Sequence, residues 1–112
     1  MKEGDIILVD LGEIGKEVKG HELGKTRPCV IVKLLNQIQM AVVVPLSHGK
    51  PANLFTIVEI EQNFESTSNK PSYALCHQIR SISFNRVLKK LDTLNEKNYN
   101  SILLTILDFF QI

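Results

Sequence analysis

Residues 28–33 read Pro-Cys-Val-Ile-Val-Lys, a run in which nearly every position suits a protein interior. A half-exposed strand alternates apolar and polar residues, whereas a strand covered on both faces is apolar at consecutive positions. The run therefore predicts a strand that is buried on both sides. Arg27 stands immediately before Pro28, where a polar stretch gives way to this strand, so the strand offers its side chain a rigid mount.

Short runs rich in β-branched residues flank this strand and are separated by turn residues. We expect strands at residues 5–10, 38–44, 54–60 and 72–77, with a short piece at 87–91 that closes the sheet and a hairpin connection at 34–37. No connection has the pattern of a crossover helix. The sequence therefore predicts a mainly β fold, a small antiparallel barrel, rather than a parallel sheet.

One helix is expected at the C-terminus. Residues 93–96 read Thr-Leu-Asn-Glu, which has the form of a capping box that satisfies free amide groups at a helix start. Apolar side chains then recur at helical spacing, at Tyr99, Ile102, Leu103, Ile106 and Phe110. This stripe either covers the barrel or faces a partner, and the usual burial of such residues favours the first interpretation.

Length and composition predict one domain that spans residues 1–112. The chain has 44% apolar and 22% charged residues, which is ordinary for a globular protein. Its net charge of +1 supplies no global field toward nucleic acid, so any RNA contact must be local. Cys29 and Cys76 lie within apolar runs, and no segment approaches the ~20 apolar residues of a spanning helix. We expect a cytoplasmic protein, without a membrane segment, whose thiols are reduced and mostly buried.

The polar connections at residues 11–26 and 61–71 are candidates for function. The first exceeds the ~12–15 residues beyond which structureless loops are uncommon. Its last part, GHELGKTRP at residues 20–28, is either a solvated charged loop or one edge of a reaction site. The planar guanidinium of Arg27 is suited to the second role because it matches two phosphate oxygens.

Two further strand ends carry polar groups. Ser47 and His48 follow the run at 42–46, where a simple turn is the alternative interpretation. His77 ends the strand expected at 72–77, where a histidine often only completes local hydrogen bonding, and Arg80 is more often a salt-bridge partner than a catalytic group. If alternate strand ends meet at one rim, the rim collects groups able to bind a phosphate and to move protons. These groups are Arg27, Lys25, Ser47, His21, His48, His77 and Glu22.

Other chemistries find little support. The three histidines lack close ligand spacing, so a zinc site is disfavoured. Ser47 lacks a nucleophile-elbow sequence, and no glycine-rich nucleotide loop occurs. We therefore expect no metal and no cofactor, and the inventory at the rim suits metal-independent cleavage of a phosphodiester.

Five motifs follow one another in the order GDIILVDL, GHELGKTRPCVIV, VVVPLSHG, CHQIRSIS and LDTLNEKN. In this order they resemble the MazF/PemK family, the toxins of bacterial toxin–antitoxin pairs, over roughly residues 4–110. The resemblance implies an SH3-like barrel with a C-terminal helix and a homodimer. It also implies a sequence-specific endoribonuclease that cleaves single-stranded RNA without a metal and leaves 2′,3′-cyclic phosphate and 5′-hydroxyl ends.

The resemblance also implies roles for individual residues. Arg27 matches the arginine of the family's R-P step, which is central to catalysis, and Ser47 matches the hydroxyl residue that binds the scissile phosphate. His21 and Glu22 match the H-E pair upstream of R-P in the PemK-like branch, and Gln78 and Arg80 match the Q-x-R after the fifth strand. Apart from the resemblance, Lys25, Thr26, His48 and His77 are further candidates for catalysis or substrate binding. We expect His21, Glu22 or His77 to handle the protons.

Two positions depart from the family pattern. His77 stands where an acid is frequent, and Leu75 stands where some members have an arginine. The alternative function is therefore a member without catalysis that binds its antitoxin and, with it, operator DNA as a co-repressor. In either case the expected partners are a cognate antitoxin, operator DNA in the toxin–antitoxin complex and a second copy of the chain, and for the enzyme also single-stranded RNA.

Overall fold

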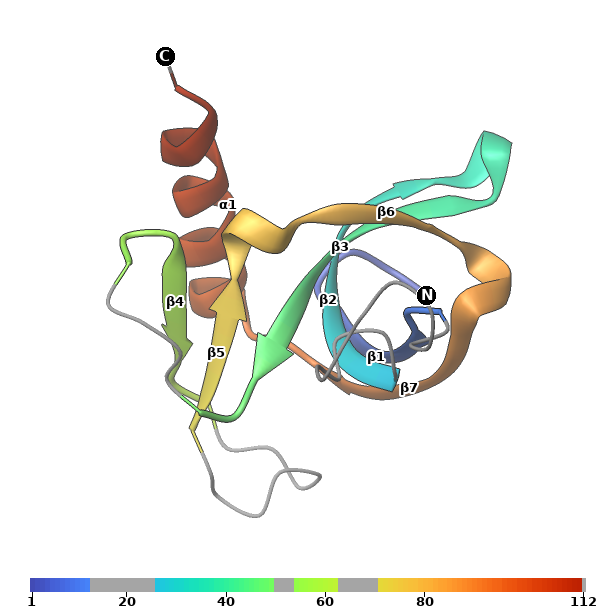
Figure 1. Cartoon of the computed structure of the whole chain (residues 1–112), viewed down its shortest axis with the longest axis horizontal. Coiled ribbons are helices and arrows are strands. Elements are labelled where there is room, and N and C mark those ends of the chain that lie inside the picture. Colours follow the sequence, from blue (N-terminus) through green and yellow to red (C-terminus); the bar gives the residue numbers. More distant parts are fainter. Residues whose placement is uncertain (13–25, 50–53, 63–70, 112) are drawn as a thin grey trace.

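The computed structural model describes residues 1–12, 26–49, 54–62 and 71–111 (Figure 1). Within these ranges the chain forms seven strands, three short 3₁₀ turns and one α-helix. The strands are β1 (Asp5–Asp10), β2 (Thr26–Leu35), β3 (Met40–Ser47), β4 (Ile57–Ile60), β5 (Ser72–Leu75), β6 (Arg80–Ser83) and β7 (Val87–Thr93). The 3₁₀ turns are η1 (Asn36–Ile38), η3 (Cys76–Gln78) and η4 (Phe84–Arg86), and the helix is α1 (Glu96–Phe110).

All strand pairs are antiparallel, and their order is β4-β5-β3-β2-β1-β7. Strand β6 pairs with the first half of β3, while β5 pairs with the end of β3. Since β6 runs through η4 into β7, which pairs with β1, this segment closes a ring made of β3, β2, β1 and β7 with β6 (Figure 1). The ring is the small barrel that the sequence predicts, and β4 and β5 extend from it.

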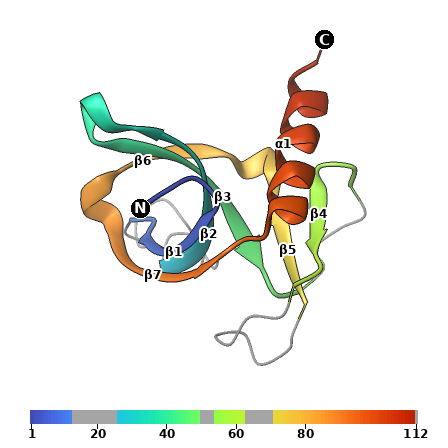
Figure 2. The same cartoon turned by 180° about the vertical axis from the view of Figure 1, so that it is seen from behind.

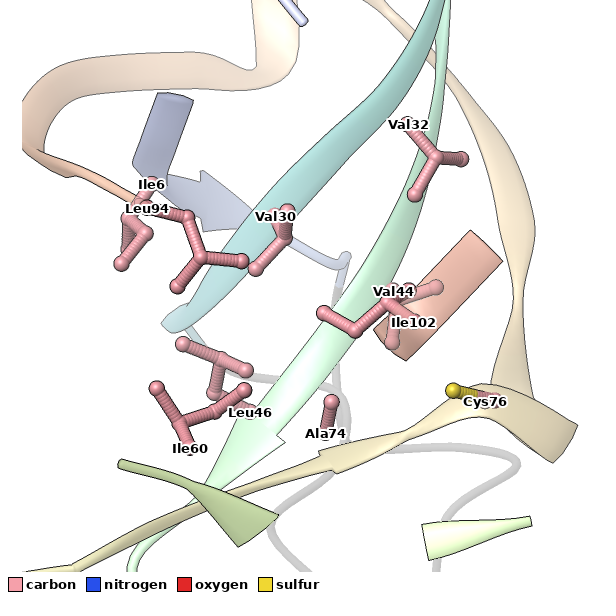
Figure 3. Close-up of a cluster of buried hydrophobic side chains, with 10 residues drawn as sticks. All are labelled: Ile6, Val30, Val32, Val44, Leu46, Ile60, Ala74, Cys76, Leu94 and Ile102. Carbon is pink, nitrogen blue, oxygen red and sulfur yellow. The ribbon is translucent and has the colours of Figure 1, made fainter. Parts of the chain in front are cut away.

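The barrel encloses one of two apolar cores. We call it the barrel core, and its buried members are Ile7, Val9, Leu11, Cys29, Ile31, Ala41, Val43 and Ile82. The second, which we call the helix core, gathers side chains from β1 to β5 and α1 (Figure 3). Its buried members are Ile6, Val30, Val32, Val44, Leu46, Ile60, Ala74, Cys76, Leu94 and Ile102.

Strand β2 contributes alternate side chains to both cores. Cys29 and Ile31 enter the barrel core, whereas Val30 and Val32 enter the helix core, as side chains of a strand point to opposite faces in turn. Cys29, Val30 and Ile31 are fully buried. The prediction of a strand buried on both faces is therefore confirmed.

The helix α1 covers the face of β4 and β5 that lies behind these strands in Figure 1 and in front of them in Figure 2. Its Ile102 is fully buried, and the Tyr99 hydroxyl donates a hydrogen bond to the Val32 carbonyl at 3.0 Å. Farther along, Leu103 and Phe110 are 37% and 61% exposed. The predicted stripe therefore packs against the helix core through Tyr99, Ile102 and Ile106, whereas Leu103 and Phe110 are exposed. No helix within the described ranges is long and apolar enough to cross a membrane.

The predicted capping box is wrong. Asn95 is the N-cap, and its side chain accepts a hydrogen bond from the Asn98 amide at 2.8 Å. Thr93 belongs to β7, and its hydroxyl donates to the buried carboxylate of Asp5 at 3.2 Å. This carboxylate also accepts from the Lys2 amide and lies 3.5 Å from the Lys90 ammonium group. Thr93 cannot cap the helix because it lies in β7 and its hydroxyl bonds the buried carboxylate. Asn95 is the N-cap instead.

Other boundaries also differ from the predictions. The hairpin connection lies at η1 and Gln39, because Gln39 adopts the left-handed conformation that turns the chain back. Strand β4 begins only at Ile57, after a turn closed by the Ile57 amide and the Leu54 carbonyl. Strand β5 ends at Leu75, where η3 begins. Strand β6 was not predicted, since it has four residues and buries only Ile82.

The helix core predicts a stability contrast along α1. We expect Ile102→Ala to lower the free energy of unfolding by about 2–5 kcal/mol, because it removes a fully buried side chain. Leu104→Ala is the matched control: Leu104 is 63% exposed, so its loss should cost about 0.5 kcal/mol or less. Urea denaturation followed by circular dichroism measures both values. Equal costs would contradict the packing of α1 described above.

Candidate functional site at the barrel mouth

Arg27 is held at one open end of the barrel. It is the second residue of β2, and the alternation of the strand gives its side chain the same face as Cys29 and Ile31 in the barrel core. The side chain is half-buried, and Nη1 donates a hydrogen bond to the Leu46 carbonyl at 3.2 Å. Because a guanidinium carries five N–H donors, this bond fixes the group and leaves others for a ligand.

Ser47 lies beside Arg27. Cys29 pairs with Pro45, so two residues farther along each antiparallel strand Arg27 comes opposite Ser47, the last residue of β3. The Ser47 hydroxyl donates to the Gly49 carbonyl at 2.9 Å. It is half-buried, and its oxygen retains acceptor capacity. The structure thus places a cation and a hydroxyl side by side, as the rim hypothesis requires.

Arg80 approaches the same end of the barrel from the other side. It begins β6, pairs with Val43 and shares the face of Ile82 in the barrel core. Burial raises the pKa of the Cys29 thiol to about 12, and the positive charges of Arg27 and Arg80 oppose this rise only in part. Both guanidinium groups are thus close enough to act on one thiol. Among the described residues, neither guanidinium forms an ion pair.

We call Arg27, Ser47, Arg80 and the buried Cys29 the barrel mouth. Two positive charges and a hydroxyl stand there above a neutral thiol, which suits the binding of an anion. The thiol is a poor nucleophile, because the thiolate is the reactive form. Cys76 is likewise free and buried, and burial raises its pKa to about 11. The expectation that both thiols are buried is confirmed.

His77 lies apart from Arg27 and Ser47. Ser47 pairs with Tyr73 near the start of β5, whereas His77 follows the other end of β5, in η3. Its Nδ1 shares a hydrogen bond of 2.9 Å with the hydroxyl of Thr56, a residue that is 4% exposed. Gln78, in the same turn, is half-buried. The structure therefore gives His77 a bonded structural position and leaves its Nε2 for any proton transfer.

The remaining predicted residues have simple positions. Thr26 begins β2 and is exposed, and His48 is exposed just after β3. His21, Glu22 and Lys25 lie outside the described residues. In the ranges that the structure describes, no group of three or more His, Cys, Asp or Glu side chains is arranged to hold a metal ion.

Two residues beside Ser47 were missed by the sequence analysis. Tyr73 of β5 is directly opposite Ser47, and Glu59 of β4 is directly opposite Tyr73. The alternation of side chains along β4 and β5 could have shown that Glu59 and Tyr73 point away from the core. Their position next to Ser47 depends on the register between β3, β5 and β4, which no local sequence pattern reveals.

Comparison with known proteins identifies the family of the chain. Residues 2–110 match the model of the family described as PemK-like, MazF-like toxin of type II toxin–antitoxin system. An endoribonuclease MazF of Staphylococcus saprophyticus is 34% identical over 106 residues, which cover 91% of this chain and 84% of that protein. The chain therefore belongs to the PemK-like, MazF-like toxin family.

Solved structures show the same fold. MazF from Deinococcus radiodurans superposes with a TM-score of 0.73 at 13% identity, covering 100% of this chain and 97% of that chain. An endoribonuclease in complex with its cognate antitoxin, from a mycobacterial species, gives a TM-score of 0.70 at 15% identity, covering 96% and 92%. The predicted small antiparallel barrel with a C-terminal helix is confirmed.

The protonation of the two thiols predicts their reactivity. At pH 8 we expect a disulfide reagent such as DTNB to label neither cysteine rapidly in the folded protein, because both are buried and their raised pKa values keep them protonated. In denaturant both should react, since exposure lowers each pKa toward its ordinary value of about 8.5. Absorbance of the released thiolate measures the labelling. Rapid reaction of Cys29 in the folded protein would contradict its position in the barrel core.

Proposed function

We propose that the chain is an endoribonuclease toxin that cuts single-stranded RNA without a metal ion, within one domain that spans residues 1–112. The observation that carries this proposal is the Arg27 guanidinium, fixed by the Leu46 carbonyl next to the Ser47 hydroxyl at the barrel mouth. The family of the chain and the name of its staphylococcal relative support the same activity. As in that family's toxins, the natural setting would be the cytoplasm.

The reaction needs no covalent bond between the enzyme and the RNA, so the enzyme acts mainly by stabilising charge. The ribose 2′-oxygen adjacent to the scissile phosphate attacks phosphorus, a 2′-O–P bond forms and the P–O5′ bond breaks. The products are a 2′,3′-cyclic phosphate and a 5′-hydroxyl. Negative charge builds on the phosphate oxygens in the transition state, where the remaining donors of Arg27 bind them. Ser47 contacts the same phosphate by turning its hydroxyl away from the Gly49 carbonyl.

Two proton transfers complete the reaction. A base takes the proton of the 2′-hydroxyl, and an acid gives one to the leaving 5′-oxygen. His21 and Glu22 lie six and five residues before Arg27 in the sequence, respectively, and are the favoured candidates. His77 is less favoured because it follows the end of β5 that lies away from Ser47, and its Nδ1 shares a hydrogen bond with the Thr56 hydroxyl. Arg80, Lys25, Thr26, His48 and Gln78 would bind the flanking RNA.

The same cationic surface suits an inhibitory partner. One solved relative is an endoribonuclease in complex with its cognate antitoxin. We propose that an acidic segment of an antitoxin covers the barrel mouth of this chain and excludes RNA from it. The active form would be a homodimer, and its complex with the antitoxin would bind operator DNA.

An alternative is a toxin-like chain without catalysis that serves as an antitoxin-binding co-repressor. Leu75 and His77 favour this alternative, because the family resemblance implies an arginine in some members at the first position and often an acid at the second. Expression of the chain in a bacterial host separates the two functions. Growth arrest with RNA fragments that end in cyclic phosphates supports the enzyme, whereas normal growth together with tight antitoxin binding supports the co-repressor.

The proposed role of Arg27 predicts a large loss of activity. We expect Arg27→Ala to cut a long single-stranded RNA at least about 100-fold more slowly than the wild type, the usual effect of removing one donor to the developing charge. Gel analysis of timed digests measures the rates. Lys97→Ala is the matched control, because this ammonium group lies on α1 and is 3.6 Å from the Glu61 carboxylate. Equal cleavage by Arg27→Ala and the wild type would falsify the role.

The proposed role of Ser47 predicts a smaller and reversible effect. Ser47→Ala should slow cleavage about 10- to 100-fold, which corresponds to one hydrogen bond to a charged group of ~1.5–3 kcal/mol. Ser47→Thr keeps the hydroxyl and should retain most activity. The same digests, with thermal unfolding to confirm that each variant is folded, measure the contrast. If the alanine and threonine variants are equally impaired, the hydroxyl is not the group that acts.

A further inference from the structure

The sheet formed by β4, β5 and the end of β3 has one face that α1 does not cover. Val58, Ile60, Ala74 and Leu46 point toward α1 and pack in or against the helix core. Side chains at the intervening positions therefore project from the opposite face. This face is turned toward the viewer at β4 and β5 in Figure 1, where α1 lies behind the strands.

Three residues of this face form a row across the strands. Glu59 is directly opposite Tyr73, and Tyr73 is directly opposite Ser47. Neighbouring strands are ~4.8 Å apart, so Tyr73 stands one spacing from Ser47 and Glu59 stands about 10 Å from it. Arg27 continues the row on the far side of Ser47. The row thus leads away from the barrel mouth across neighbouring strands.

The chemistry of the row changes with distance from the barrel mouth. The Tyr73 ring is half-buried and offers an aromatic surface, on which an unpaired base stacks. Glu59 is exposed, and its carboxylate repels a phosphate while accepting hydrogen bonds from a base edge. A row that runs from cation to hydroxyl to ring to carboxylate therefore matches a phosphate followed by a neighbouring base.

We propose that Tyr73 and Glu59 form a base-recognition subsite of the barrel mouth, in which Tyr73 stacks on a base beside the scissile phosphate and Glu59 selects a base with an exocyclic amino group. This inference rests on the proposed ribonuclease function. Cytosine, adenine and guanine carry such an amino group, whereas uracil does not. A carboxylate accepts hydrogen bonds from amino groups, so uracil at this position would be disfavoured.

The test compares cut sites and binding for matched variants. The 5′ ends of fragments from a long RNA give the base preference around each cut. A randomised pool of 2′-O-methyl RNA gives the same preference for binding alone, because it lacks the attacking hydroxyl. In both measurements the wild type should disfavour uracil at one position beside the cut, and Glu59→Gln should weaken this preference about tenfold.

Tyr73 and a control carboxylate complete the design. Tyr73→Ala should raise KM and weaken binding of the pool about tenfold, whereas Tyr73→Phe keeps the ring and should behave as the wild type. Glu61→Gln is the control for charge, because Glu61 lies in the same region but its carboxylate is 3.6 Å from Lys97 on α1. This variant should keep the wild-type base preference.

The two proposals fail in different ways. Absence of cleavage by the wild type would contradict the ribonuclease function, while a base preference in the binding pool that Glu59→Gln weakens would still support the subsite. Cleavage that depends on Arg27 but has the same base preference in the wild type and Glu59→Gln would overturn the subsite. An unchanged KM in Tyr73→Ala would overturn the stacking role of Tyr73.

Discussion

The burial of β2 on both faces is the constraint on which the rest of the structure depends. Cys29 and Ile31 fill the barrel core, while Val30 and Val32 fill the helix core. A shift of one residue in the pairing of β2 would exchange the two sets of side chains, so the register is strongly fixed. Arg27 precedes this segment by two residues and inherits its face. The position of the cation at the barrel mouth is therefore a consequence of apolar packing on two sides of one strand.

Strand β3 places further side chains next to Arg27. On one edge it pairs with β2, and on the other its first half pairs with β6 and its end with β5. The sheet therefore divides along the length of β3: its first half belongs to the barrel through β6, and its end carries the β4–β5 extension. Ser47 lies where the two parts meet, next to Arg27 and opposite Tyr73. Side chains from three strands thus lie next to one another while each remains on a rigid element.

The sequence predicted what local patterns encode. Consecutive apolar residues identified β2, and the order of five motifs identified the family and its barrel. Local patterns did not reveal β6, which has a single buried side chain, nor the choice of Asn95 over Thr93 as the N-cap, because the Thr93 hydroxyl is taken by Asp5 from the other end of the chain. The rim hypothesis treated all strand ends alike. Only the register separates Ser47, next to Arg27, from His77, at the other end of β5.

The barrel mouth also explains how a chain with a net charge of +1 can attract an anion. Arg27 and Arg80 lie near the Cys29 thiol, and an ionised thiolate there would cancel one of their charges. Burial prevents this by raising the pKa of Cys29 to about 12, so the thiol stays neutral at physiological pH. The apolar packing that orients Arg27 therefore also preserves the local positive charge. On the proposed function, RNA and an acidic antitoxin segment would compete for this charge.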